Sequence, residues 1–217
     1  MQDEIFKEYE GNHWYERNEK ALDAAKNDYI VDMVKFLGLN PKSVAEVGCS
    51  NGYRLEHFRR EFGCECLGID ASAEAVAAGR EKFPSINFQQ ATLAEMVAPK
   101  KYDLVVCNFV LHWVDRSSVM ASVANIDTFV RGGGTLVLGD FLPDYNQRRK
   151  YHHLPELDMY TYKQDYAAMF TASGLYKEVY RHTFNHDKQE PGYAASPERG
   201  VRVALRKMEN DEYYTLV

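Results

Sequence analysis

The stretch that decides the fold is Val44-Ala-Glu46-Val-Gly48-Cys-Ser-Asn-Gly52, which is followed by Leu67-Gly-Ile-Asp70. A short apolar run ends in an acidic residue, two glycines stand four residues apart, and a second apolar run ends in a carboxylate. This order predicts a strand, a tight turn, a helix and a second strand tipped by Asp70. Glycines let the backbone approach a ligand, and a carboxylate at that position hydrogen-bonds ribose hydroxyls. The stretch therefore predicts a nucleoside site.

Apolar runs and amphipathic segments alternate through the rest of the chain. Tyr102-Asp-Leu-Val-Val-Cys107 is a solid apolar run, which is typical of a strand buried on both faces of a parallel sheet. The alternation predicts a doubly wound α/β domain with right-handed crossovers. We expect strands at residues 43–47, 64–69, 86–90, 102–107, 135–139, 176–184 and 200–207. We expect helices at residues 18–37, 52–62, 72–83, 116–130 and 163–173, and a surface tail at 208–217.

Length and composition limit the class of protein. The chain has 217 residues, of which 45% are hydrophobic and 27% charged, as in one globular domain. Its net charge of −6 argues against nucleic acid as the main partner, because phosphate binding needs a basic surface. The sequence shows no secretion signal, and no apolar stretch approaches the roughly 20 residues that span a bilayer. We expect a cytoplasmic protein without a membrane segment, as a monomer or a homodimer.

The cysteines do not form a metal-binding pattern. Cys49, Cys64, Cys66 and Cys107 include no CxxC pair, and no histidine stands at zinc spacing. We expect all four to be reduced, small apolar side chains, as is usual in the cytosol.

Two classes of nucleoside could use the glycine turn. A nicotinamide dehydrogenase has G-x-G-x-x-G, whose third glycine allows close helix–strand packing under a pyrophosphate. Here Ser50 takes the middle position and Leu55 takes that of the third glycine. Glu46 at the end of the strand also disfavours a pyrophosphate and suits a cationic or zwitterionic ligand. The turn therefore favours a nucleoside without a diphosphate.

An ordered set of motifs identifies a family. Glu46-x-Gly48-x-x-x-Gly52, Asp70, Tyr102-Asp103-Leu-Val-Val-Cys107-Asn108 and Arg131-Gly-Gly-Gly-Thr-Leu-Val-Leu follow one another in the chain. Together they resemble the class I S-adenosylmethionine-dependent methyltransferases that act on small molecules, from about residue 44 to residue 139. The resemblance implies a Rossmann-like, seven-stranded, mostly parallel sheet with an antiparallel C-terminal strand. It also implies a single methyltransferase domain over residues 1–217.

The resemblance implies which residues bind S-adenosylmethionine, and its product S-adenosylhomocysteine, around the glycine turn. Gly48, Cys49 and Gly52 would bring the backbone against the methionine and ribose portions. Asp70 would accept both ribose hydroxyls, and Ala71 would pack on the adenine face. The structural alternatives are that the glycines only permit a tight turn and that Asp70 only caps the next helix.

Further cofactor contacts are implied beneath the glycine turn and at the ends of the third and fourth strands. Glu46 would lie beneath the turn, holding the loop or reaching the cofactor amino group through water. Where the family usually offers an acidic residue to adenine, this chain has Ala91-Thr92-Leu93, so we expect the contact from the backbone or from the Thr92 hydroxyl. Asn108 and Phe109 should line the methionine side.

The segment after the fourth strand carries the prediction for catalysis. It reads Asn108-Phe-Val-Leu-His112-Trp113, unlike the Asn-Pro-Pro-Tyr segment that holds a planar amide or a nucleobase amine. Base and protein-glutamine methylation are therefore disfavoured. His112 is a candidate general base toward a hydroxyl or an amine. The alternative is that it orients the cofactor loop.

Two further segments are expected to cover the site. Residues 1–18 should fold over the cofactor mouth, with Trp14 covering the site and Arg17 meeting the methionine carboxylate. Residues 141–162 should form an acceptor-side insertion, at the edge where open α/β sheets bind ligands. Its cationic and aromatic content suggests an acceptor with phosphate or carboxylate, although a solvated loop is the open alternative. The candidate substrate-binding residues are Tyr145, Arg148, Arg149, His152, His153 and Tyr162.

The sequence thus predicts methyl transfer to an oxygen or a nitrogen of a small, anionic metabolite. A sugar or phospho-compound of surface-glycan or secondary metabolism is the expected acceptor. One alternative is an RNA or protein methyltransferase, which would need an exposed basic stripe. Another is a non-catalytic relative that works through partners, and a nicotinamide dehydrogenase is the third.

Overall fold

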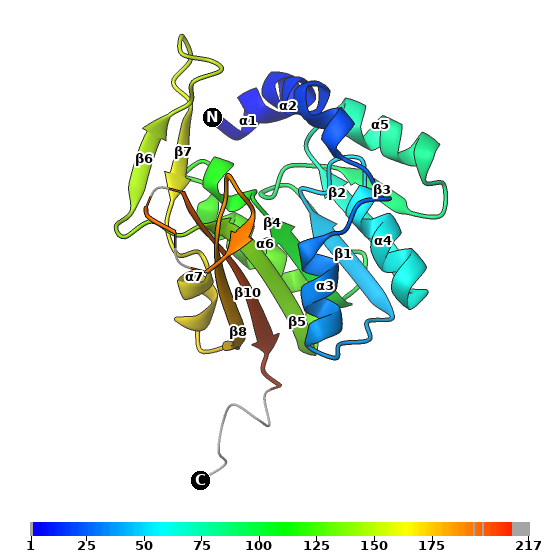
Figure 1. Cartoon of the computed structure of the whole chain (residues 1–217). Helices are drawn as coiled ribbons and strands as arrows, with labels where there is room; N and C mark the ends of the chain where they lie inside the picture. Colours follow the sequence, from blue (N-terminus) through cyan, green and yellow to red (C-terminus); the bar gives the residue numbers. More distant parts are fainter. Residues whose placement is uncertain (1, 193, 197, 210–217) are drawn as a thin grey trace.

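A mixed β-sheet forms the centre of the computed structural model, which describes residues 2–192, 194–196 and 198–209 (Figure 1). The strand order is β3-β2-β1-β4-β5-β10-β8-β9. β1 to β5 pair in parallel, and β10 is antiparallel to both β5 and β8. This arrangement confirms the predicted doubly wound fold, and the two-residue β9 extends its edge. In the sheet the strands are β1 (Ser43–Val47), β2 (Glu65–Asp70), β3 (Asn87–Gln90), β4 (Tyr102–Asn108), β5 (Val130–Phe141), β8 (Tyr176–Asn185), β9 (Glu190–Pro191) and β10 (Arg199–Lys207).

Two hydrophobic cores cover the two faces of the sheet. Successive residues of a strand point to opposite faces, so Val44 of β1 packs in one core and Ala45 in the other. The core around Val44 contains side chains of α3 and α4, and the core around Ala45 contains side chains of α6 and α7. Burial on both faces explains the solid apolar runs of the central strands. The helices are α1 (Gln2–Ile5), α2 (Gly11–Asn18), α3 (Tyr29–Phe36), α4 (Tyr53–Phe62), α5 (Ala73–Lys82), α6 (Val119–Phe129) and α7 (Ala167–Thr171), with shorter turns η1 (Phe6–Glu10), η2 (Glu19–Ala21) and η3 (Leu111–Trp113).

The predicted start of the first long helix is wrong. A helix was expected over residues 18–37, but α2 ends at Asn18 and α3 begins at Tyr29. The cause is Asp28, whose carboxylate accepts hydrogen bonds from the N–H groups of Ile30 (2.9 Å) and Val31 (3.2 Å). Asp28 therefore caps α3 and stops a continuous helix.

The fifth strand is longer than predicted. β5 spans Val130–Phe141, whereas the expectation was 135–139 with the three glycines as a turn before it. Gly133 has a φ of +66°, and the register of β5 against β4 shifts at this point. The glycines therefore form an irregular part of the strand, where a positive φ favours glycine. The helices expected at 116–130 and 163–173 are shortened to α6 and α7.

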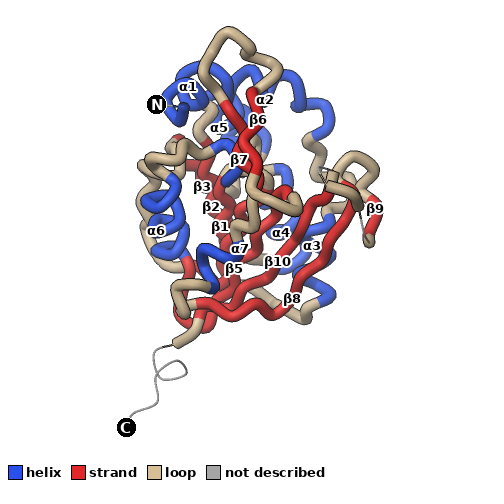
Figure 2. Tube along the Cα trace, turned by 90° about the vertical axis from the view of Figure 1, so that its left-hand side faces the viewer, coloured by secondary structure: helices blue, strands red, loops and turns tan. Residues whose placement is uncertain are grey.

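The segment at 141–162 contributes most of a two-stranded hairpin. β6 (Gln147–Lys150) pairs antiparallel with β7 (Tyr160–Lys163). Figure 2 shows this hairpin beside the N-terminal helices, at one end of the sheet. Tyr151, Leu154 and Met159 form a small third core there, against which Ile5, Phe6, Trp113 and Leu157 pack. The predicted insertion is thus a structured element that packs on the N-terminus.

The remaining expectations concern the tail, the cysteines and the membrane. Residues 210–217 of the expected tail lie outside the described residues. All four cysteines are free and buried. Within the described ranges, we find no helix with both the length and the apolar character needed to cross a membrane.

We predict that Asp28→Ala lowers the free energy of unfolding through two separable contributions. Loss of the helix cap should cost about 1 kcal/mol. Loss of the hydrogen bond that the Nε of buried Arg54 donates to the Asp28 carboxylate (2.8 Å) should cost a further amount of about 1.5–3 kcal/mol. Asp28→Asn keeps a capping oxygen and should lose chiefly the second contribution. Urea denaturation measures both.

Asn27→Ala is the matched control for Asp28, because Asn27 is the exposed neighbour. It should change the free energy of unfolding by no more than about 0.5 kcal/mol. Equal stability of the Asp28→Ala and Asn27→Ala variants would contradict the assignment of Asp28.

Candidate functional site

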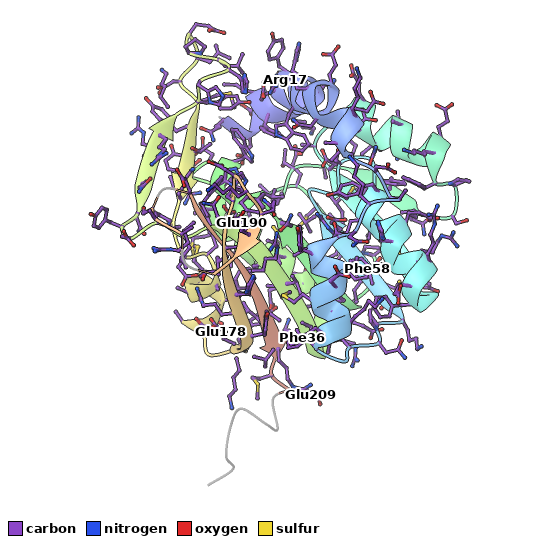
Figure 3. All side chains as sticks on the ribbon, in the orientation of Figure 1. Arg17, Phe36, Phe58, Glu178, Glu190 and Glu209 are labelled. Carbon is purple, nitrogen blue, oxygen red and sulfur yellow. The ribbon has the colours of Figure 1, made fainter. Side chains whose placement is uncertain are left out.

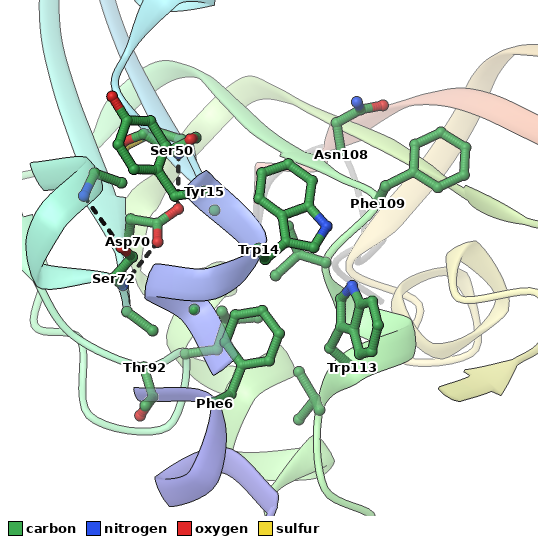
Figure 4. A pocket seen from close by; sticks show the side chains of 18 of the residues that line it. Phe6, Trp14, Tyr15, Ser50, Asp70, Ser72, Thr92, Asn108, Phe109 and Trp113 are labelled. Carbon is green, nitrogen blue, oxygen red and sulfur yellow. Dashed lines mark hydrogen bonds between the residues drawn. The ribbon is translucent and has the colours of Figure 1, made fainter. Parts of the chain in front are cut away.

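A cavity of about 310 Å³ lies at the carboxyl ends of β1, β2 and β4, beneath the N-terminal helices (Figure 4). Ligand sites of open parallel sheets are found at this edge. Aromatic side chains from the N-terminus and from η3 form much of its wall. Lining residues that the sequence predicted are Trp14, Gly48, Cys49, Asp70, Ala71, Thr92, Leu93, Asn108 and Phe109.

The turn after β1 brings the backbone to the cavity. Gly48 has a φ of +71°, and its N–H donates to the carbonyl of Ile69 at 2.7 Å. A Cβ on Gly48 would collide with the side chain of Val110, which also lines the cavity. Gly52 has a φ of +77° and faces the Phe88 ring, so it supports the turn from behind and does not line the cavity. The turn needs glycine at both positions.

Asp70 is fixed at one end of the cavity by two backbone donors (Figure 4). Its Oδ2 accepts a hydrogen bond from the N–H of Ser50 at 2.7 Å, and its Oδ1 accepts one from Ser72 at 2.9 Å. Burial raises the pKa of Asp70, and these N–H groups act in the opposite direction. Ser72, by contrast, caps α5 by accepting from the N–H of Ala75. Ser72, and not Asp70, therefore caps α5, whereas the alternative interpretation had given this role to Asp70.

Glu46 lies beneath the turn and outside the cavity wall. Its carboxylate pairs with buried Arg54, which does line the cavity and also pairs with Asp28. Burial raises the pKa of Glu46 to about 7, and the charge of Arg54 opposes that effect. The second carboxylate oxygen of Glu46 has no hydrogen-bond partner among the described residues. The geometry fits the expectation that Glu46 holds the loop.

The N-terminal segment forms one wall of the cavity. Phe6, Trp14 and Tyr15 reach the cavity from it. Arg17 does not line the cavity: its guanidinium pairs with the buried carboxylate of Glu10 and donates to the Tyr151 hydroxyl at 2.9 Å. Figure 3 shows Arg17 on the N-terminal helices, at the end of the molecule away from Phe36. Arg17 thus joins the N-terminal segment to the hairpin.

Asn108 and Phe109 lie at the end of the cavity opposite Asp70 (Figure 4). The Oδ1 atom of Asn108 is buried without a hydrogen-bond partner among the described residues, and it lies against Gly139. Phe109 has a φ of +57°, which is uncommon for an aromatic residue. Its ring packs edge-on against Phe141, with 5.1 Å between ring centroids. Strained backbone of this kind is concentrated at functional sites.

His112 is buried behind Phe109. It is 4% exposed, and its Nδ1 lies 2.9 Å from the carboxylate Oδ1 of Asp140. Its ring packs against Phe109, Trp113 and Phe141 and is not part of the cavity wall. The geometry resembles a support of the loop more than a group in contact with substrate.

None of the predicted substrate-binding residues lines the cavity. Tyr145 is 78% exposed, and the Arg148 guanidinium stacks on the Tyr160 ring at 3.6 Å. The rings of His152 and His153 contact one another in a tilted arrangement, with 4.0 Å between their centroids. Arg149 is exposed, and the Tyr162 ring packs under Arg116 at 4.4 Å. Among the described residues, no three His, Cys, Asp or Glu side chains are placed to hold a metal ion.

The sequence analysis missed several residues that line the cavity. For one of them, His186, the sheet topology explains why it reaches the cavity. β10 is antiparallel to β5 and β8 is antiparallel to β10, so β8 runs parallel to β5. The turn after β8 therefore reaches the same edge as the turns after β1, β2 and β4. A histidine that directly follows this strand was the available signal. Other missed lining residues include Asp3, Phe6, Gly11, Tyr15, Tyr53, Arg54, Val110 and Trp113.

Comparison with known proteins identifies relatives of the central region. Residues 44–134 match the family described as "Methyltransferase domain". A dTDP-3-amino-3,4,6-trideoxy-alpha-D-glucopyranose N,N-dimethyltransferase from Streptomyces venezuelae is 27% identical over 53% of this chain and 49% of its own length. A trans-aconitate 2-methyltransferase from Rhodopseudomonas palustris is 34% identical over 35% of this chain and 30% of its own length. The chain therefore spans half or less of the length of these relatives.

A solved structure shares the fold. It is a 1,6-didemethyltoxoflavin-N1-methyltransferase from Burkholderia thailandensis with bound 1,6-didemethyltoxoflavin and S-adenosylhomocysteine. The TM-score is 0.64 at 15% identity, over 82% of this chain and 76% of that chain. At this identity the similarity shows the fold alone.

We predict that Gly48→Ala costs more stability than Gly38→Ala. Both glycines have positive φ, +71° and +66°, but no atom lies within 4 Å of a Cβ on Gly38. Gly38→Ala should therefore lose only the left-handed strain of about 1–2 kcal/mol. Gly48→Ala should lose a further amount of about 1–3 kcal/mol, because it displaces Val110. Chemical denaturation gives both values, and Gly48→Ala/Val110→Ala should recover part of the second; equal losses would refute the packing argument.

Proposed function

We propose that this chain, whose residues 44–134 match the methyltransferase-domain family, is a class I S-adenosylmethionine-dependent methyltransferase that binds S-adenosylmethionine in the cavity and methylates a small molecule. The accepting atom is an oxygen or a nitrogen, and S-adenosylhomocysteine is the product. The observation that carries the proposal is the Asp70 carboxylate, which Ser50 and Ser72 fix at one end of an aromatic-walled cavity.

The Asp70 end of the cavity fits a ribose. Each carboxylate oxygen has two lone pairs, and the hydrogen bonds from Ser50 and Ser72 use one on each. The acceptor positions that remain on the carboxylate can take a pair of adjacent hydroxyls. Ala71, Thr92 and the other small or apolar side chains at this end leave a site for the base.

The opposite end fits the amino-acid portion of the cofactor. Asn108 lines this end of the cavity, and its amide oxygen, which packs against Gly139, would accept a hydrogen bond from an ammonium group after rotation of the side chain. The glycine turn at Gly48 lets the backbone approach the same space. Glu46, paired with Arg54, would hold that turn from below.

The remaining chemistry falls to the side chains around the cavity. When bound, S-adenosylmethionine supplies a methyl group already activated for in-line displacement. The chain must then align the acceptor, exclude water and receive a proton from the accepting atom. Phe6, Trp14 and Trp113 serve to exclude water from above.

The acceptor we propose is an anionic sugar or phospho-compound of surface-glycan or secondary metabolism. The relatives from S. venezuelae and R. palustris are named for a dTDP-linked amino sugar and for trans-aconitate, which carry phosphate and carboxylate groups. These names support an anionic acceptor. The cytoplasmic location and the monomeric or homodimeric state stay predictions.

We predict that the protein binds S-adenosylmethionine and S-adenosylhomocysteine but not NADH. Asp70→Asn should weaken this binding by a factor of about 10 or more, because a charge-assisted hydrogen bond contributes about 1.5–3 kcal/mol. Isothermal titration calorimetry measures all three ligands. Asp70→Asn is preferred to Asp70→Ala because an amide oxygen can still accept from Ser50 or Ser72.

Glu74→Gln is the matched control, since Glu74 is an exposed acid on the neighbouring helix α5. It should leave the affinity unchanged. Absence of adenosyl-ligand binding by the wild type would point to the non-catalytic alternative, and NADH binding would overturn the assignment of the cavity.

His112 and His186 are the two candidates for the general base, and we predict that the kinetics of variants at each position distinguish them. His186 lines the cavity, and its Nδ1 is hydrogen-bonded to the Asp187 carboxylate at 3.1 Å, which leaves its other ring nitrogen as an acceptor. His186→Ala should lower kcat by about 10²–10⁴ if His186 receives the proton. His112→Asn should act more weakly, through the loop that it supports. Measuring kcat requires a methyl acceptor, which is to be found by screening phosphorylated sugars and carboxylic acids.

The catalytic assignment of His112 from the sequence stays a prediction until that comparison is made. Full turnover in His112→Asn with loss in His186→Ala would remove it. The reverse result would support it and would require the loop at Phe109 to move.

A further inference from the structure

One face of the β6–β7 hairpin carries two cations. Residues alternate between faces along a strand, and Gln147 stands opposite Lys163 in the register. The Arg149 Nε donates to the Gln147 side-chain oxygen at 2.9 Å, so these three side chains share one face. Arg148 and Lys150 belong to the other face, where both approach the Tyr160 ring. The two cations of the first face are thus separated from the rest of the basic cluster.

Lys163 is half-buried and lacks an ion-pair partner. Its Nζ lies 3.4 Å from the centroid of the Phe141 ring. In the described part of the chain, no carboxylate lies within ion-pair distance of Lys163 or Arg149. Burial, followed by the charge of Arg149, lowers the pKa of Lys163 to about 8. Two cations without an ion-pair partner among the described residues therefore lie close together in a protein with a net charge of −6.

Phe141 links these cations to the acceptor end of the cavity. Its ring centroid lies 4.7 Å from that of His186 and 5.1 Å from that of Phe109. Both of those residues line the cavity. A small molecule that reaches from the cavity past Phe141 would meet Lys163 next.

The nearby carboxylates have other partners. Asp140 lies against His112, with 2.9 Å between Oδ1 and Nδ1. Asp187 is 67% exposed and accepts a hydrogen bond from His186. Both raise the pKa of Lys163, but less than burial and Arg149 lower it. The positive charge of Lys163 and Arg149 therefore stays available to an anionic ligand.

We propose that Lys163 and Arg149 form an anion subsite beside Phe141, which binds a phosphate or carboxylate group of the methyl acceptor. The subsite rests on the proposed function for its place in the reaction. It holds the charged group while the accepting atom lies at the His186 end of the cavity. Gln147 positions Arg149, and Phe141 forms the wall that both parts of the acceptor contact.

The sulfate and malonate ions are suitable probes, one for a phosphoryl group and one for a carboxylate group. Calorimetric titration should be made with wild type, Lys163→Gln, Arg149→Gln and Lys150→Gln, each loaded with S-adenosylhomocysteine. Lys163→Gln and Arg149→Gln should weaken binding of the preferred ion by a factor of about 10. Lys150→Gln removes the same charge from the opposite face of the same hairpin, and should weaken it by a factor of less than about 2. The stronger of the two ions identifies the acceptor group.

A pH series distinguishes binding by Lys163 from a general electrostatic attraction of anions to the protein. Both ions keep a constant charge above pH 7, whereas Lys163 loses its proton as the pH rises through about 8. Wild-type affinity should therefore fall between pH 7 and pH 9. The affinity of Lys163→Gln should stay flat over this range, because the titrating amine is gone.

Equal weakening by Lys150→Gln and Lys163→Gln would overturn the subsite, and so would the absence of ion binding by the wild type. These outcomes are distinct from failure of the proposed function, which would appear as loss of S-adenosylhomocysteine binding in the wild type. Repeating the titration without that ligand keeps the subsite testable in that case. Unchanged circular dichroism shows that each variant is folded.

Discussion

The carboxylate of Asp70 joins the turns that follow two neighbouring strands. β1 and β2 are parallel, so both turns lie at the same edge of the sheet. One carboxylate oxygen accepts from Ser50 in the first turn and the other from Ser72 in the second. The positive φ angles of Gly48 and Gly52 give the first turn its shape. The position of the cavity floor therefore depends on backbone geometry to which the Asp70 carboxylate is hydrogen-bonded on both sides.

The roof of the cavity comes from segments that are distant in the sequence. The Gln2 side chain donates to the carbonyls of Trp113 (2.6 Å) and Tyr160 (2.7 Å), which joins the N-terminus to η3 and to the hairpin. Tyr151 and Arg17 contact the same buried carboxylate, that of Glu10. Because the hairpin and the N-terminal helices share these contacts, they form one structural unit over the cavity.

Local pattern predicted the central strands well and the first helix poorly. A run such as Tyr102–Asn108 is apolar on both faces only when both faces are covered, so its environment can be read from its composition. Residues 18–37 also have helical periodicity, but Asp28 caps a new helix and pairs with Arg54, 26 residues further along the chain. A contact of that separation outweighs local propensity, and no local rule contains it.

The candidate site divides in the same way. The sequence by itself determined the Asp70 end of the cavity, because Gly48 and Asp70 stand at fixed distances from the strands that place them. Only the tertiary structure decided the opposite end of the cavity, where His186, which follows β8, and Lys163 of the hairpin reach Phe141. The physical reason is that a strand fixes the position of the residues at its own end, whereas which separate segments meet there depends on how the whole chain packs.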